Sequence, residues 1–299
     1  MGAQEKSVSQ SVKVVVLTRP RSLRLSEPMA VPSSNPSTLE LALQAQGYTI
    51  QYVPLIDIQG PPEPQIIEQL SAQLHQFQAI MFVSPQAVMH FFANLRMDMN
   101  RWTTPCWVTG GGSEAALLRA GVKAELIFKP EDDSGLWDSE HLWLRVEGLV
   151  NTAQRVLIVR GRDDAKASSG AVDVEQDVRD GVAQSMDAGV GREYLSQKLQ
   201  DKGIEVRYLV AYQRSSPTWT QEECSRVREL LGPGTVWLFT SSQAAKNLAQ
   251  LLKPFDFSNA LAIATHERIA KELRHLGFGV VLLSLPGTKD LMRSLESLP

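Results

Sequence analysis

The sequence predicts an α/β protein with two similar domains, each built on a parallel sheet flanked by helices. Three observations lead to this fold class. Short runs rich in β-branched residues alternate with segments of helical period, a pattern typical of parallel α/β layers. The order of these units recurs in the second half of the chain. The chain has 299 residues, of which 43% are hydrophobic, and this suffices for two cores in domains of about 150 residues.

Ten strands are expected, because each candidate segment is short, rich in Val, Ile, Leu or aromatic residues, and bounded by turn-forming residues. In chain order they are residues 13–18, 49–54, 79–83, 106–109, 124–128, 155–160, 205–210, 236–240, 260–264 and 279–283.

Amphipathic helices fill the intervals between these strands. The clearest cover residues 38–46, 64–73, 113–120, 192–202, 221–231 and 267–276. Several end in a glycine that suits a left-handed cap, which predicts positive φ at Gly47, Gly121, Gly203, Gly232 and Gly277.

Three pairs of segments repeat along the chain. The strand–helix segment 79–88 matches 236–245, so that Ser84 corresponds to Ser241 at an offset of 157 residues. Residues 13–20 with 47–55 match 155–161 with 203–212, and CWVTGGGSEAALLRAG matches LAIATHERIAKELRHLG. Two domains of three units each are therefore expected, although the sequence leaves open which units share a sheet.

Composition excludes several classes of protein. A net charge of −3 argues against a general affinity for nucleic acid. The aliphatic runs are far shorter than the roughly 18 to 20 residues that cross a bilayer. The two cysteines form no CxxC pair and have no histidine at metal-ligand spacing, which indicates a reducing compartment without structural zinc. We expect a cytoplasmic chain with no metal, membrane or nucleic-acid partner.

Two stretches interrupt the repeating pattern. Residues 21–38 are rich in Pro and Ser and are expected to form an exposed loop. Residues 163–190 carry seven acidic and two basic side chains, a net charge of −5, with few large apolar residues. This composition favours a flexible acidic insertion over a regulatory element.

The segment GGGSEA, residues 110–115, fits a dinucleotide-binding pattern between a strand and a helix. It lies in the third unit of the chain, however, and its counterpart ATHERI has no glycine. Three interpretations remain open: a nucleotide site, a turn that only packs a helix, and a turn whose amides bind substrate carboxylates.

Serines stand where two strands pass into helices, at Ser84 and at Ser241 with Ser242. At least one serine of each site is expected to cap its helix, which contributes roughly 1 kcal/mol. The carboxyl ends of parallel strands are also where α/β proteins bind ligands, and helix N-termini favour anions there.

The ordered set LTRP, VSPQAV, VTGGGSEAALLRAG, VLIVRG, YLVAYQR, FTSSQAAKNL and AIATHERIAKELRHLG resembles the uroporphyrinogen-III synthase family. The resemblance runs from about residue 13 to 285 and is broken by the acidic insertion. It implies two lobes joined by a two-stranded linker, with a cleft between them. The first lobe would comprise residues 1–55 and 210–299, and the second residues 56–209.

The resemblance also implies a reaction. The family cyclises hydroxymethylbilane to uroporphyrinogen III with loss of water and inversion of the last pyrrole ring through a spiro intermediate. Because the activated chain closes unaided to the uninverted isomer, such an enzyme works mainly by orienting its substrate. No cofactor and no metal are expected, and the protein is expected to be a monomer.

Carried over by motif, Tyr212 would be the catalytic residue, because its phenol is protonated at neutral pH and can donate a hydrogen bond to the departing hydroxyl. An aromatic that only packs the linker is the alternative for this residue. Amides, hydroxyls and a cation would bind the substrate carboxylates. These expected binding residues are Arg19, Ser84, Gln86, Gly111, Gly112, Ser113, Arg160, Gly161, Thr240, Ser241, Ser242 and Thr265.

Two rival functions agree with the same sequence. A two-lobed protein could bind a small anion without catalysis, and an oxidoreductase could use GGGSEA to bind a nucleotide. Incubation with hydroxymethylbilane separates them, because only the synthase forms the III isomer.

Overall fold

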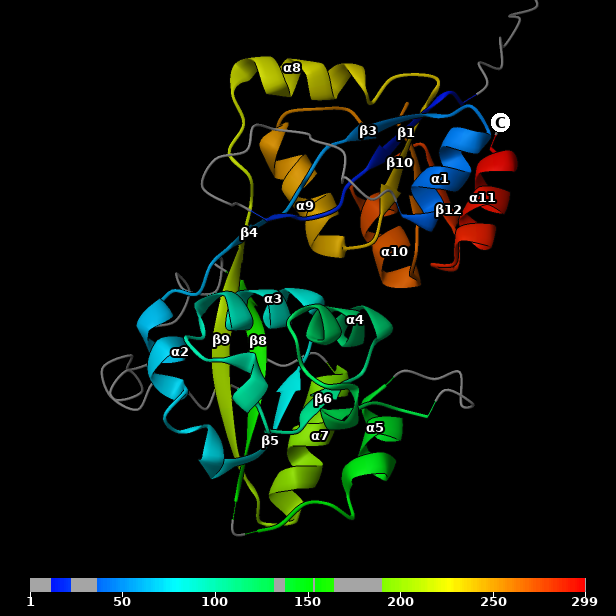
Figure 1. The fold of residues 1–299 in the computed structure, drawn as a ribbon. Coiled ribbons are helices and arrows are strands. Elements are labelled where there is room, and N and C mark those ends of the chain that lie inside the picture. The colour runs from blue at the N-terminus through cyan, green and yellow to red at the C-terminus, as the bar shows by residue number, and fades with distance from the viewer. Residues whose placement is uncertain (1–11, 23–36, 132–137, 153, 164–189, 299) are drawn as a thin grey trace, which may run out of the picture. The chain divides into compact units, whose positions relative to one another are not determined.

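The computed structural model describes residues 12–22, 37–131, 138–152, 154–163 and 190–298 (Figure 1). Most of the predicted loop over 21–38 and of the predicted insertion over 163–190 lies outside the described residues. The end residues of both segments are described and are regular, contrary to the prediction. Arg21 and Ser22 form a short strand and Thr38 begins a helix. Asp163 belongs to a strand and Val190 begins a helix.

The chain forms two compact units. Unit 1 comprises Met1–Ile58 and Ser215–Pro299, and unit 2 comprises Gln59–Arg214. The chain therefore passes from one unit to the other twice. The boundaries implied by the family resemblance were residues 55 and 209.

Unit 1 contains five parallel strands in the order β12-β11-β10-β1-β3. Their bounds are β1 Val14–Leu17, β3 Thr49–Tyr52, β10 Thr235–Phe239, β11 Leu261–Ala264 and β12 Val280–Leu283.

Helices cover both faces of this sheet (Figure 1). One face packs on α1 (Thr38–Ala45) and α11 (Thr288–Glu296) through a core that includes Val15, Leu43 and Leu291. The other packs on α9 (Ser242–Leu251) and α10 (Glu267–His275). Alternate strand residues face opposite layers, and this explains why the strands are continuous apolar runs. Helix α8 (Gln221–Glu229) precedes β10.

Unit 2 repeats this plan in the strand order β9-β8-β5-β6-β7. The strand bounds are β5 Phe77–Phe82, β6 Cys106–Val108, β7 Ile127–Phe128, β8 Arg155–Asp163 and β9 Glu205–Ser215. Two short strands precede them in the chain: β2 Arg21–Ser22 lies in unit 1, and β4 Asp57–Gln59 ends at the boundary between the units. The helices are α2 Pro64–Leu70, α3 Pro85–Asn94, α4 Gly111–Arg119, α5 Ser139–Val146 and α7 Val190–Asp201, with short 3-10 turns at Leu74–Gln76, Met99–Arg101 and Ala124–Leu126.

The two sheets have equivalent strand orders. Strands β3, β1, β10, β11 and β12 of unit 1 correspond in order to β9, β8, β5, β6 and β7 of unit 2. The segments that the sequence repeat pairs occupy these equivalent places. The structure thus answers which units share a sheet: the segment 155–212 joins the segment 77–128 in unit 2.

All ten predicted strands are present, with shifted ends. Strands β8 and β9 run several residues beyond their predicted ends because they pair with each other as far as Asp163 and Arg214. The predicted strand 124–128 is a 3-10 turn followed by the two residues of β7. The two short strands β2 and β4 were not predicted, since two or three residues give no period to detect.

One predicted glycine cap is wrong. Positive φ occurs at Gly47, Gly121, Gly203 and Gly277 as expected, but the fifth case is Gly234 rather than Gly232. Pro233 follows Gly232, and a residue before proline favours extended backbone, so the left-handed turn comes after the proline.

None of the helices in the described part of the chain is long and apolar enough to cross a membrane.

Candidate functional site

Each unit has a topological switch point, where neighbouring strands lead to helices on opposite faces of the sheet. In unit 1 this point lies between β1 and β10, and in unit 2 it lies between β8 and β5. The crevice outside the carboxyl ends of two such strands is the usual ligand site of open α/β sheets. The residues beyond these strand ends therefore define a candidate site in each unit.

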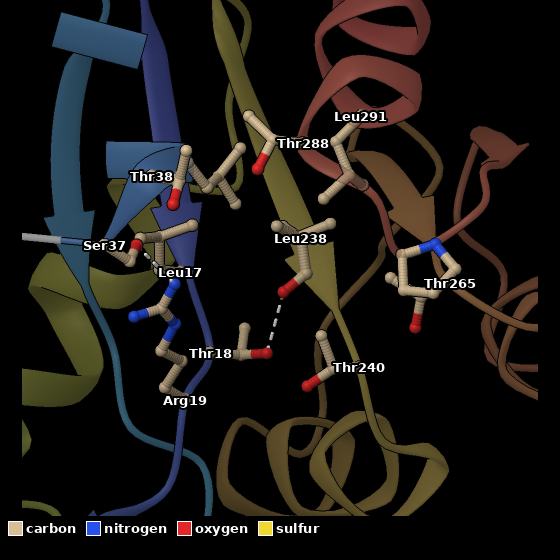
Figure 2. A pocket seen from close by; sticks show the side chains of 12 residues that line it. Leu17, Thr18, Arg19, Ser37, Thr38, Leu238, Thr240, Thr265, Thr288 and Leu291 are labelled. Carbon is tan, nitrogen blue, oxygen red and sulfur yellow. Dashed lines mark hydrogen bonds between the residues drawn. The ribbon is translucent and has the colours of Figure 1, made fainter. Parts of the chain in front are cut away.

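A pocket of about 260 Å³ lies at the switch point of unit 1 (Figure 2). It has an apolar floor, continuous with the core beneath α1 and α11, and a rim of hydroxyl groups with one guanidinium. The floor is formed by Leu17, Leu39, Leu238, Pro286 and Leu291, and the rim by Thr18, Arg19, Ser37, Thr38, Thr240, Thr265 and Thr288.

The strand ends and two helix starts place these rim groups. Thr18 and Arg19 follow β1, Thr240 follows β10, and Thr265 follows β11. Thr38 and Thr288 are the first residues of α1 and α11, whose N-termini carry partial positive charge. The buried Thr18 hydroxyl ties the two strands of the switch point together, because it donates to the Leu238 carbonyl at 2.8 Å.

Arg19 is held at this rim by a network that begins at a buried carboxylate. Its Nη1 lies 3.4 Å from Glu40 Oε2, and its Nη2 donates to Ser37 Oγ at 3.0 Å. Ser37 and Glu40 form a capping box at the start of α1, and the Tyr52 hydroxyl donates to the other Glu40 oxygen.

These contacts keep Glu40 ionised although it is buried. Burial by itself raises the pKa of a carboxyl group, but hydrogen bonds from Ser37 and Tyr52 and the nearby Arg19 charge lower the pKa of Glu40 to about 2. Burial and the Glu40 carboxylate together raise the pKa of Tyr52 to about 12.

The serines after β10 differ from the capping prediction. Ser241 stands at the N-cap of α9, but its side chain makes no capping hydrogen bond. The Ser242 hydroxyl is buried and has no hydrogen-bond partner among the described residues. Thr265 instead bonds the strand end, since its amide and hydroxyl both donate to the Phe239 carbonyl, at 3.2 and 3.4 Å.

The switch point of unit 2 is built around Tyr212. Ser84 caps α3 by accepting from the Ala87 amide at 3.2 Å, and its hydroxyl lies 3.1 Å from the Tyr212 hydroxyl. The Tyr212 residue is 5% exposed, and its ring stacks on His90 with centroids 5.9 Å apart. Gly161 is its register partner across the β8–β9 pair.

Gly161 is buried directly beneath the Tyr212 ring. A Cβ at this position would lie 2.3 Å from Tyr212 Cζ, so only glycine lets the ring occupy its place. This adds a packing role to the substrate contact predicted for Gly161. The β9 strand has an irregular register between these pairs, since Arg160 is opposite Val210 and Gly161 is opposite Tyr212.

The remaining predicted residues of unit 2 lie at the starts of α3 and α4. Gln86 is in the first turn of α3, and α4 opens with Gly111, Gly112 and the buried Ser113. The two helix starts are close together, because a Cβ at Gly112 would lie 3.2 Å from Pro85 Cγ.

Arg160 is buried rather than exposed at the site. It is 6% accessible, and its guanidinium carbon lies 5.1 Å from the centre of the Tyr208 ring. Its charge is therefore directed into unit 2 in this structure.

The sequence did not predict Ser37 and Glu40 as partners of Arg19, Tyr52 as a partner of Glu40, or Thr288 as a pocket residue. The Ser-x-x-Glu spacing of residues 37–40 is the signature of a capping box and could have marked the start of α1. Nothing in the sequence indicates that Tyr52, on the next strand, reaches the same carboxylate.

Within the residues that the structure describes, no three His, Cys, Asp or Glu side chains are grouped as metal ligands.

The family described as "Uroporphyrinogen-III synthase HemD" matches residues 37–167 and 173–292, which is most of the sequence. The chain belongs to the uroporphyrinogen-III synthase family. That membership supports a role in tetrapyrrole biosynthesis as a cyclising lyase that needs no cofactor.

Solved structures of uroporphyrinogen-III synthases resemble this one. The Helicobacter pylori enzyme is 14% identical, with a TM-score of 0.54, over 96% of this chain and 100% of that chain. A mutant enzyme from the extremely thermophilic bacterium Thermus thermophilus is also 14% identical, with a TM-score of 0.46, over 96% of this chain and 98% of that chain. A search of curated proteins found no match. The likeness to the Helicobacter pylori enzyme extends the family assignment to the α/β architecture.

Proposed function

We propose that this chain closes hydroxymethylbilane to uroporphyrinogen III and that the two switch points supply the groups that hold and activate the substrate. The observation that carries this assignment is the chemistry at the strand ends. Unit 1 offers a hydroxyl-lined pocket with Arg19 on its rim, and unit 2 offers the Tyr212–Ser84 pair. A polycarboxylate that needs orientation and one proton suits such groups.

The substrate carries eight carboxylates, two on each of its four pyrrole rings. Arg19 is the cation proposed for the pocket of unit 1, with Thr240 and Thr265 as neighbours on the rim. Helix starts supply further donors: Ser241 and Ser242 at α9, Ser84 and Gln86 at α3, and Gly111, Gly112 and Ser113 at α4. Arg160 and Gly161 of β8 complete the set proposed from the family resemblance; both are buried in this structure, Arg160 against the Tyr208 ring and Gly161 beneath Tyr212.

Tyr212 is proposed as the proton donor of the first step. The hydroxyl of the bilane leaves as water when it takes a proton, and the cationic chain then forms a carbon–carbon bond at the substituted position of the last ring. Rearrangement of the resulting spiro intermediate inverts that ring. The proton lost when the ring regains aromaticity restores the phenol, so protons balance over the cycle.

The outcome depends on orientation more than on acid strength. The same cation closes unaided to the uninverted isomer, and a protein that only released hydroxide would therefore make the wrong product. Groups that fix several carboxylates at once restrict the chain to the geometry that favours the substituted carbon. We also propose that the protein acts as a cytoplasmic monomer and that hydroxymethylbilane is its small-molecule partner.

The decisive experiment is incubation of the purified protein with freshly prepared hydroxymethylbilane. The products are oxidised and the isomers separated by chromatography. Predominant isomer III, with isomer I in the protein-free control, is the expected result. Isomer I alone, with measurable binding of the substrate, would instead identify an anion-binding protein without catalysis.

Tyr212→Phe tests the proposed donor. The substitution keeps the ring on Gly161 and His90 and deletes only the hydroxyl, so we expect turnover to fall about 10- to 100-fold with the fold intact, at the low end of general-acid effects. Unchanged turnover in a folded variant would leave Tyr212 as a packing residue.

A further inference from the structure

Glu40 is a buried carboxylate that the proposed reaction does not use. It is 2% exposed and accepts a hydrogen bond from the Ser37 amide at 2.5 Å. Its other contacts are the Tyr52 hydroxyl and the Arg19 guanidinium. Of these partners, Arg19 and Ser37 line the pocket of unit 1.

Unit 2 contains equivalent elements, with a different residue at the position of Glu40. Helix α1 and strand β3 correspond to α7 and β9 at a constant offset of 156 residues, which pairs Gly47 with Gly203, both at positive φ. The same offset pairs Tyr52 with Tyr208. It pairs Glu40 with Ser196.

The arginines of the two units are also equivalent. Leu17 is the register partner of Leu238, and Ile158 is the register partner of Met81. Because Met81 and Leu238 differ by the repeat offset of 157, Leu17 corresponds to Ile158. Two residues further on, Arg19 therefore corresponds to Arg160.

The equivalent arginines take different positions. Where the helix carries Ser196, the Tyr208 hydroxyl donates to it at 2.8 Å, and Arg160 is buried with its guanidinium over the Tyr208 ring. Where the helix carries Glu40, the side chain of Arg19 stays 46% exposed beside the pocket.

We propose that Glu40 is a positioning residue that holds the Arg19 guanidinium at the pocket rim for a carboxylate of the substrate. This rests on the proposed function, because the ligand is taken to be hydroxymethylbilane. Without the carboxylate, Arg19 folds back over the Tyr52 ring as its counterpart does in unit 2.

The physical reason lies in charge and geometry. A serine is neutral and cannot hold a guanidinium against the attraction of an aromatic face, whereas a carboxylate forms charge-assisted hydrogen bonds that are roughly twice as strong as neutral ones. Glu40 and Ser37 engage only Nη1 and Nη2 of the fork, and a guanidinium has five N–H donors. The N–H groups that remain can bind a substrate carboxylate. Because the Arg19–Glu40 ion pair has no net charge, it favours the substrate by orienting the Arg19 guanidinium and not by adding positive charge.

Glu40→Ser copies the residue of unit 2 and is the principal test. We expect KM for hydroxymethylbilane to rise about tenfold, equivalent to about 1.4 kcal/mol of lost binding, with kcat within about twofold. In an Arg19→Met background the same substitution should cause no further rise. A crystal structure of E40S should place the Arg19 guanidinium within about 6 Å of the Tyr52 ring centre.

Two further variants separate positioning from loss of a helix cap. Glu223→Ser removes the matching capping box of α8, in the same unit and outside the pocket, and should leave both kinetic constants unchanged. Glu40→Gln can retain the capping box while removing the charge, and should raise KM without the full loss of stability.

The proposal fails if folded E40S and E40Q keep the KM of the natural chain, or if E40S raises KM equally with and without Arg19. An Arg19 that stays at the rim in the crystal structure of E40S overturns it as well, and that measurement needs no activity. Failure of the proposed function has a different signature, since the natural chain would then form no isomer III.

Discussion

Substitution of Gly161 by alanine tests the packing of the catalytic candidate Tyr212. The added Cβ would lie 2.3, 2.4 and 2.8 Å from Cζ, Cε2 and Cε1 of the ring, whereas carbon atoms in contact are ordinarily about 3.5 to 4.0 Å apart. The ring must therefore move by more than about 1 Å. It is 5% exposed, stacked on His90 and bonded to Ser84, so it has no free space to enter.

We expect this change to cost about 2 to 3 kcal/mol in free energy of unfolding, the upper range for overpacking a core. For a unit of this size that corresponds to a fall of roughly 5 to 10 °C in Tm. Turnover should also fall, because a phenol moved by this distance no longer holds its hydroxyl beside Ser84, where Tyr212 is proposed to donate.

Calorimetry and the isomer assay measure the two effects separately. Gly148→Ala is the matched control in the same unit, since a Cβ there would meet nothing within 4 Å. Combining Gly161→Ala with Tyr212→Val should cost less stability than the sum of the two single substitutions, because the smaller side chain leaves room for the added Cβ, but activity should not return because the donor is absent. A G161A variant with unchanged Tm and turnover would refute the reasoning.

Two other predictions concern ionisation. Folding lowers the pKa of Glu40 from 4.5 to about 2. The ionised carboxylate therefore contributes fully to the free energy of unfolding above pH 4.5, and this contribution is lost as the pH falls toward 2. About 2 kcal/mol should be lost by pH 3, and urea unfolding of Glu40→Gln should show a smaller loss over that range; equal losses would contradict the prediction. Burial raises the pKa of Cys106 to about 12, while Cys224 is partly exposed, so a thiol reagent should label Cys224 first in the folded protein and Cys106 only after denaturation. Equal labelling rates would show that Cys106 is accessible.

The sequence by itself determined the elements and the repeat. Periodicity and β-branched composition depend on neighbours within a few residues, and the ten predicted strands are therefore all present. The matched segments around Ser84 and Ser241 also predicted that each unit would present polar groups at equivalent strand ends. Folding placed both beside switch points.

Only the tertiary structure decided which strands are neighbours and what each side chain contacts. Glu40 on α1 is contacted both by Arg19, which follows β1, and by Tyr52 on β3. Tyr212 lies over Gly161, 51 residues earlier in the chain. The equivalent residues Arg19 and Arg160 would look alike in any local pattern, yet one is exposed and the other buried. Such differences arise from contacts between segments far apart in the chain, where packing and charge pairing outweigh local preference.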